Sequence, residues 1–212
     1  MFKSLFAKKK PVRKLESAAD LQIGDLFTLS DRLYLPESLR GVTCEVINIG
    51  AYEFSTGYET EFSLKTQQGD NYTLSLSDDD GELALCFCQK IPKNTVLQLF
   101  SEEDIGEIFA DGFAHFSSKQ DVPVELDGWV AEKYQETTDC ASCYYHKVDM
   151  RGKMPDHGSL GVEEALQYYE CSGGDNDDYG LFIENSADGE TEIYLTRTVA
   201  LTSIAEYWPN AR

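Results

Sequence analysis

The sequence predicts a mainly β, α+β protein built from antiparallel strands, in two related sheet-like or barrel-like halves with one or two short helices. Three observations indicate this fold class. Twelve Tyr and eleven Phe favour strands and half-buried surfaces. Apolar and polar residues alternate in several short runs, which is the period of a strand with one buried face. Turns rich in Gly, Asp and Pro separate these runs at short intervals.

The strands are expected wherever such a run lies between two turn signals. Alternation is clearest at residues 72–77, where Tyr72, Leu74 and Leu76 share one face. The acidic turn at residues 78–81 and the run that follows it predict a hairpin. Strands are also expected at residues 21–29, 42–49, 61–65, 83–91, 129–135, 143–150, 179–184 and 191–199.

One helix is expected in the body, because Ser101 and Asp104 have the spacing of a capping box. It should run to about Ala110 and end before Gly112. Residues 163–170 are open to two interpretations. Their propensity favours a helix, whereas their pair of tyrosines favours a strand.

Two hairpins, near residues 72–88 and 179–195, look alike. Each has a Tyr-x-Leu-x-Leu/Ile strand, an acidic turn ending in Gly-Glu and an alternating return strand. Duplication of one β-rich half would explain this similarity, and so would the features that any two good hairpins share. We therefore divide the chain into a basic apolar tail, residues 1–14, and two β-rich halves, residues 15–118 and 119–212, which fold either separately or as one compact domain.

The charge of the chain is unevenly distributed. The first 14 residues hold six of the 18 Lys and Arg and no acid, so the remaining 198 residues carry 12 bases against 38 acids, a net charge of −26. Nucleic acid is not an expected partner, because binding a polyanion needs clustered Lys and Arg. The acidic body serves solubility, or it imitates a polyanion toward a basic partner.

The sequence indicates a cytoplasmic protein. In the tail the lysines follow the apolar residues, whereas a signal peptide has its basic residues first. No stretch approaches the roughly 20 apolar residues of a membrane-spanning helix. The six cysteines are therefore expected to be reduced thiols or metal ligands, and not a disulfide framework.

Cys140, Cys143 and His146 form the best candidate for metal binding, because two thiolates at C-x-x-C spacing and a nearby imidazole can bind one tetrahedral Zn²⁺. A structural zinc site needs four ligands, however, and these residues supply three. A thioredoxin-like redox motif is followed by a helix, whereas this motif runs into an expected strand. We therefore expect packing or surface cysteines, with no metal and no cofactor. The common catalytic motifs are also missing from the sequence, so we expect no enzyme.

The tail is the expected contact element. Three apolar side chains fall on one face of a short helix and lysines flank it. Burial is worth roughly 1.5–3 kcal/mol for each apolar side chain, but so short a helix is costly to form and the acidic body is repelled by an anionic surface. We expect weak membrane contact, docking onto a partner or onto the acidic body, or a frayed tail without a role. The contact residues would be Phe2, Leu5, Phe6, Lys8, Lys9 and Lys10.

The succession LQIGDLF, GVTCEVINIGAYEF, GDNYTLSLSDDDGELALCFCQKI, DGWVAEKYQE and YGLFIENSADGETEIYLTRTV resembles a bacterial domain family of unknown function, the YjfK type. The resemblance spans most of residues 20–200 and rests on strand spacing. Members of this family are encoded beside PspA-like membrane-remodelling proteins. The resemblance implies a soluble accessory protein in a membrane-stress system, and it provides no catalytic residues.

The sequence thus predicts a non-catalytic cytoplasmic accessory or adaptor protein whose partner is a protein, such as a PspA-like one. Deleting residues 1–14 tests this prediction. The deletion should change partner pull-down, membrane fractionation or both. The alternative is an acidic immunity or inhibitor protein that covers the basic active site of a toxin. That alternative predicts tight, salt-sensitive, one-to-one binding by the body alone.

Overall fold

The structure is a computed structural model that describes residues 13–79, 82–153 and 163–210. In this part of the chain the strands form one antiparallel sheet. Their bounds are β1 Leu26–Leu29, β2 Thr43–Phe54, β3 Gly57–Thr66, β4 Asn71–Asp79, β5 Glu82–Ile91, β6 His115–Ser117, β7 Lys133–His146, β8 Glu163–Gly173, β9 Tyr179–Ser186, β10 Thr191–Ala200 and β11 Ile204–Trp208. The predicted fold class, mainly β and antiparallel with short helices, is confirmed.

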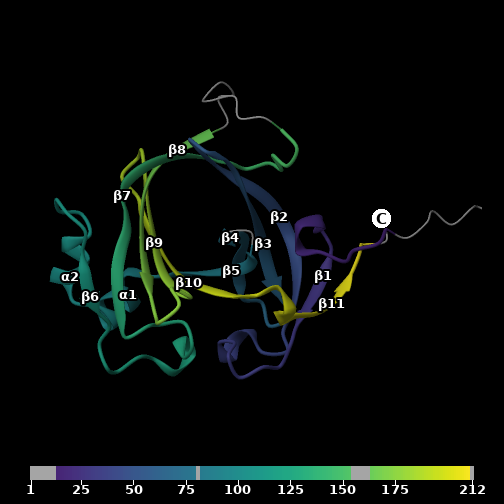
Figure 1. The fold of residues 1–212 in the computed structure, drawn as a ribbon, viewed down its shortest axis with the longest axis horizontal. Coiled ribbons are helices and arrows are strands. Elements are labelled where there is room, and N and C mark those ends of the chain that lie inside the picture. Colours follow the sequence, from purple (N-terminus) through teal and green to yellow (C-terminus); the bar gives the residue numbers. More distant parts are fainter. Residues whose placement is uncertain (1–12, 80–81, 154–162, 211–212) are drawn as a thin grey trace, which may run out of the picture.

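The middle of this sheet closes on itself. The strand order is β11-β1-β2-β3-β4-β5-β10-β9-β8-β7-β6, and β2 also pairs with β7 through Ala51, Tyr52 and Glu53. The eight strands from β2 to β5 and from β10 to β7 therefore form a closed barrel (Figure 1). β1 and β11 extend the sheet beside β2, and β6 extends it beside β7, so both extensions lie outside the ring.

The barrel is built from two meanders of the same topology. β1 to β5 are successive neighbours in the sheet, and so are β6 to β10. The meanders meet at equivalent strands, since β5 pairs with β10 and β2 pairs with β7, both antiparallel. The two similar hairpins seen in the sequence are β4–β5 and β9–β10, which occupy equivalent places. Both halves of the chain therefore contribute to one closed sheet.

Each meander also contains the same 3-10 turn between its first and second strands. These turns are η2 (Glu37–Leu39) and η3 (Val124–Leu126), and both lie within the pattern Pro-x-x-Leu-x-Gly. In both turns the leucine is buried and the glycine has a positive φ, of 63° and 80°. The indole Nε1 of Trp129 donates a hydrogen bond to Ser38 Oγ at 2.9 Å, which joins the two turns.

The two faces of the barrel strands have opposite character. On β4, Thr73 and Ser75 line the lumen, while Leu74 between them faces away and is fully buried. β5 repeats this pattern, with Cys86 toward the lumen and Phe87 away from it. Strand alternation therefore gives β4 and β5 a polar inner face and an apolar outer face.

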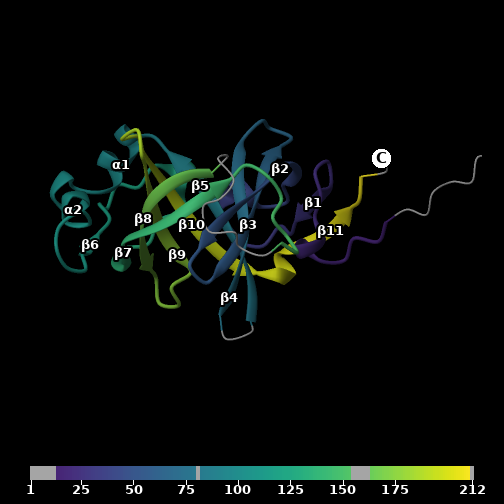
Figure 2. The same ribbon diagram turned by 90° about the horizontal axis from the view of Figure 1, so that it is seen from above.

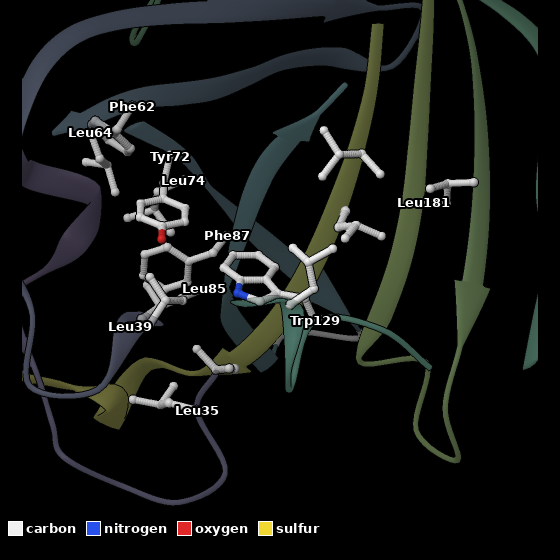
Figure 3. Packing of buried hydrophobic residues seen from close by; sticks show 14 of the residues in the cluster. Leu35, Leu39, Phe62, Leu64, Tyr72, Leu74, Leu85, Phe87, Trp129 and Leu181 are labelled. Carbon is white, nitrogen blue, oxygen red and sulfur yellow. The ribbon is translucent and has the colours of Figure 1, made fainter. Parts of the chain in front are cut away.

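The hydrophobic core covers this outer face. Trp129, fully buried just before β7, stacks on Tyr72 of β4 with ring centroids 5.7 Å apart and ring planes 1° apart (Figure 3). Leu35 and Leu39, which flank and end the first turn, belong to the same cluster as Phe87 of β5 (Figure 3). Burial of each such side chain is worth roughly 1.5–3 kcal/mol. The elements outside the ring therefore supply much of the stability of the barrel.

The two α-helices lie outside the barrel, together on the side that carries β6 (Figure 2). α2 (Glu102–Glu107) begins at Ser101, whose Oγ accepts a hydrogen bond from the backbone N–H of Asp104 at 3.0 Å, as the capping box predicts. It ends at Glu107 and not near Ala110. α1 (Lys93–Leu99) was not expected from the sequence, because Pro92 and two β-branched residues obscure its short helical pattern. η1 (Ala18–Asp20) and η4 (Leu201–Ser203) are single 3-10 turns.

Several predicted strands needed correction. Residues 129–135 and 143–150 were expected as two strands, but β7 is one strand that runs through the region between them with irregular register against β8. The ambiguous residues 163–170 belong to strand β8. The first expected strand is confined to β1, and β11 was not predicted. Within the described residues, no helix is long and apolar enough to cross a bilayer.

Candidate functional site

The barrel encloses a cavity that is lined by residues from all eight of its strands. Its volume is about 380 Å³, which corresponds to roughly a dozen water molecules at about 30 Å³ each. The lining is made of hydroxyl, thiol, carboxyl and aromatic groups, and among the described residues it includes no Lys, Arg or His. This cavity is the candidate functional site.

Small side chains on one side of the lumen leave the space open. β4 contributes Thr73 and Ser75, and β10 contributes Thr196. Gly180 of β9 is required here, because an added Cβ would lie 2.3 Å from Oγ1 of Thr196 and 3.2 Å from the carbonyl oxygen of Cys171. The cavity therefore follows from short polar side chains at alternate strand positions.

Aromatic rings form the opposite side of the lumen. Tyr52 of β2 packs on Tyr145 of β7 and on Phe182 of β9, with ring centroids 4.9 and 5.9 Å apart. Phe54 of β2 packs edge to face on Tyr168 of β8, with centroids 5.3 Å apart. The contacts Tyr52–Phe182 and Phe54–Tyr168 join strands that are not neighbours in the sheet, so these two contacts fix the width of the lumen.

Carboxyl groups from several strands reach the same space. Tyr145 Oη donates a hydrogen bond to Glu61 Oε1 at 2.9 Å, and Tyr145 reaches it over Gly50, where a Cβ would be 2.3 Å from that hydroxyl. Tyr52 Oη donates a hydrogen bond to Glu184 Oε1. Glu184 lines an adjoining hollow together with Glu61 and Lys147. Glu59 lies two residues before Glu61 on the same face of β3 and lines the cavity as well.

Burial raises the pKa of both Glu59 and Glu61 above the usual value. Hydrogen bonds from Ser75 to Glu59, and from Tyr145 and Thr73 to Glu61, offset part of this effect. The charge of Glu170 raises the pKa of Glu59 further, and Glu59 does the same to Glu61. The lumen thus holds carboxyl groups that retain protons more readily than carboxyl groups in water.

Cys86 and Cys88 lie side by side in this lumen on β5. A hydrogen bond between the two thiols lowers the pKa of Cys86, and the same bond raises the pKa of Cys88, where burial acts in the same direction. Together with the hydroxyl groups, they provide donors and acceptors around the cavity. The arrangement is suited to binding a molecule of mixed polar and aromatic character.

The predicted metal-ligand candidates are held apart. Cys140 is exposed at an irregular position of β7 with φ +43°, and it contacts Tyr169. Cys143 is buried. His146 is buried too, and its Nε2 lies 2.8 Å from Glu53 Oε2. Within residues 13–79, 82–153 and 163–210, no three His, Cys, Asp or Glu side chains are arranged to hold a metal ion.

The predicted tail contacts, Phe2, Leu5, Phe6, Lys8, Lys9 and Lys10, lie outside the described residues. The end of the tail is described, and there Arg13 forms an ion pair with the fully buried Asp25. Asp25 also accepts hydrogen bonds from the backbone N–H groups of Gln22 and Asn210, both at 2.7 Å. The end of the predicted tail is thus attached to the body close to the other terminus.

Sequence reasoning missed the lumen residues. With 38 acids in the chain, nothing distinguished Glu59 and Glu61 from the other carboxyl groups. The available signal was that Glu59 and Glu61 lie at alternate positions, as Thr73 and Ser75 do in a predicted strand, so that each pair forms a polar face. These polar faces point inward because the sheet closes through the pairing of β2 with β7, and the sequence does not show that pairing.

The comparisons with known proteins identify no relative of this chain. The resemblance to the YjfK-type family stays a prediction. A scan against protein-family models, a search of curated proteins and a search of solved structures each found no match.

Proposed function

We propose that this protein is a non-catalytic cytoplasmic binding protein that holds a small organic molecule inside its barrel. The observation that carries the proposal is the cavity of about 380 Å³ lined by all eight barrel strands. Barrels of eight strands are wide enough either to be filled by their own side chains or to hold one small ligand. A cavity of this size is typical of sites for small molecules.

The polarity of the barrel supports this proposal. A barrel that only had to be stable would fill its interior with apolar side chains, because apolar burial is the main favourable contribution to folding. Here the hydrophobic core covers the outside, and the interior combines aromatic rings with polar side chains such as Thr73, Ser75 and Thr196 around an open space. Interior polar groups need partners, and a ligand would supply them.

A thermal-shift screen tests the proposal. Wild-type protein would be heated with small organic cations, neutral polyols and organic anions, each at millimolar concentration. A ligand at 100 times its Kd stabilises by about 2.7 kcal/mol, which for a chain of this size raises Tm by roughly 5–10 °C. At least one class should produce such a shift.

Two matched variants locate the binding. Ser75→Phe places a ring in the lumen and should abolish the shift, whereas Ser142→Phe adds the same ring at an exposed position of β7 and should preserve it. The proposal fails if no class shifts the wild type while native mass spectrometry finds only the bare chain. It also fails if Ser75→Phe responds as the wild type does.

The accessory role beside a PspA-like partner, and the alternative role as an immunity protein, stay predictions. The accessory role rests on the resemblance and on the tail as contact element, whereas the immunity role rests on the acidic body alone. A ligand in the lumen is compatible with either role, because the outer surface remains available to a partner.

A further inference from the structure

We propose that the ligand of the lumen is a small organic ammonium ion, whose charge is held by carboxylates and whose body lies against aromatic rings. This inference rests on the proposed function and specifies its ligand. Three observations carry it: the sign of the charge in the cavity, the aromatic wall and the enclosure of both by the closed barrel.

The charge of the lining has one sign. Glu59, Glu61, Glu170 and Asp177 line the cavity, and within the described residues no Lys, Arg or His does. An organic anion would therefore enter a negative enclosure without a counter-ion, which disfavours its binding. A cation meets the carboxylate oxygens of the half-buried Glu59 and Glu61, where ionic hydrogen bonds are stronger than at the surface, whereas Glu170 and Asp177 are exposed.

The aromatic wall suits the same ligand. Tyr52, Phe54 and Phe182 line the cavity beside these carboxyl groups, and Tyr168 supports the last two rings at 5.3 and 5.8 Å between centroids. Ring faces attract ammonium ions and also pack against their alkyl or aryl parts. A metal ion would use the carboxylates but gain little from these rings, so the combination favours an organic cation.

Binding should release protons. Burial raises the pKa of Glu59 and Glu61, so these groups retain protons when the lumen holds no cation. An ammonium ion favours their ionised forms and displaces the protons, so affinity should increase as the pH rises through the raised pKa values. The titratable groups that face this pair from the surrounding strands are Tyr52, Cys86, Cys88, Tyr145, Tyr168, Glu170, Glu184 and Tyr194. Two cations line adjoining hollows, Arg151 beside Glu59 and Lys147 beside Glu61.

The test uses the full chain and three probes of nearly equal shape: 2-phenylethylammonium, 2-phenylethanol and phenylacetate. Isothermal titration should show the cation binding at least tenfold more tightly than the alcohol, with no binding of the anion. Titrations in buffers of different ionisation enthalpy should show proton release, and the cation's Kd should fall between pH 5 and pH 8.

Glu59→Gln and Glu61→Gln test the carboxylates, because each removes a charge and retains an acceptor oxygen. Each should weaken cation binding by about tenfold or more and reduce proton release. Glu125→Gln, on the exposed η3 turn, changes the net charge equally and should leave the Kd within about twofold. Circular dichroism would verify the fold of each variant.

Different results would overturn different conclusions. Equal binding of the cation and the alcohol, or equal effects of Glu61→Gln and Glu125→Gln, would overturn the ammonium assignment. Binding of phenylacetate or a polyol that Ser75→Phe abolishes would also overturn it, while leaving the proposed function in place. An increase in Tm that is as large with Ca²⁺ alone as with 2-phenylethylammonium would indicate a simple cation site and contradict an organic ligand.

Discussion

Cysteine illustrates how strongly the environment of one residue depends on its place in the barrel. Burial raises the pKa of Cys44, Cys143 and Cys171 to about 12 in each case. Because the thiolate is the reactive form, these three thiols should be nearly inert in the folded protein. Cys140, by contrast, is exposed on β7.

Thiol labelling checks this difference. With a bulky aromatic disulfide reagent at pH 8, Cys140 should react in a fast phase, and Cys44, Cys143 and Cys171 should react only after denaturation. Cys140→Ser should remove the fast phase. A fast phase of unchanged amplitude in that variant would show that another thiol is accessible.

At the scale of single residues, the sequence was informative where a side chain acts locally. Ser101 was predicted as a helix cap and does cap α2, because a cap depends only on neighbouring backbone groups. Glu59 and Glu61 could not be recognised, because their role depends on strands that are distant in sequence. Tyr145 lies 84 residues from Glu61 in the chain and yet donates a hydrogen bond to it.

The two Pro-x-x-Leu-x-Gly turns are equivalent elements in unequal surroundings. Both glycines have φ values in the left-handed region, so both suit glycine. At Gly41 the nearest neighbour of an added Cβ would be 3.9 Å away, on Asp31. At Gly128 the added Cβ would lie 2.9 Å from the backbone Cα of Pro36 in the other turn.

This pair provides an internal comparison. Gly41→Ala should cost about 1 kcal/mol of unfolding free energy through backbone strain alone. Gly128→Ala should cost clearly more, because the turns must also separate. Urea denaturation measures both values, and equal losses would mean that the contact between the turns contributes little to stability.

Elements were predicted well where two independent signals agreed. The β4–β5 hairpin combined clean alternation with an acidic turn, and it is present as predicted. The region around β7 was predicted wrongly because Trp129 resembled a strand residue, whereas it fills the core before the strand begins. The irregular positions of β7 then interrupted its alternation and made one strand look like two.

For the whole molecule, buried lumen acids make stability dependent on pH. A carboxyl group whose pKa is raised by folding stabilises the native state at low pH, and this contribution is lost as the pH rises above the unfolded value. The unfolded pKa of Glu is about 4.3, so the loss begins there and continues through the raised pKa of Glu61. Groups such as Asp149, whose pKa is lowered by its hydrogen bond from Arg151, act in the opposite direction.

Glu61→Gln isolates this contribution. Relative to wild type, the variant should gain unfolding free energy as the pH rises from 4 to 7, on the order of 1 kcal/mol. Urea denaturation at each pH provides the measurement, and Glu125→Gln controls for net charge. A difference from wild type that is constant over this range would mean that Glu61 is ionised equally in both states.

Pairing of β2 with β7 and of β5 with β10 has a consequence for the origin of the chain. A single meander on its own would leave both of these long strands with unpaired edges. Two identical copies related by a two-fold axis would cover all four edges, since each strand would pair antiparallel with its own counterpart. The molecule therefore has the form of a homodimer fused into one polypeptide. Its lumen lies between the two halves, and each half contributes both aromatic and hydroxyl-bearing side chains to the lining.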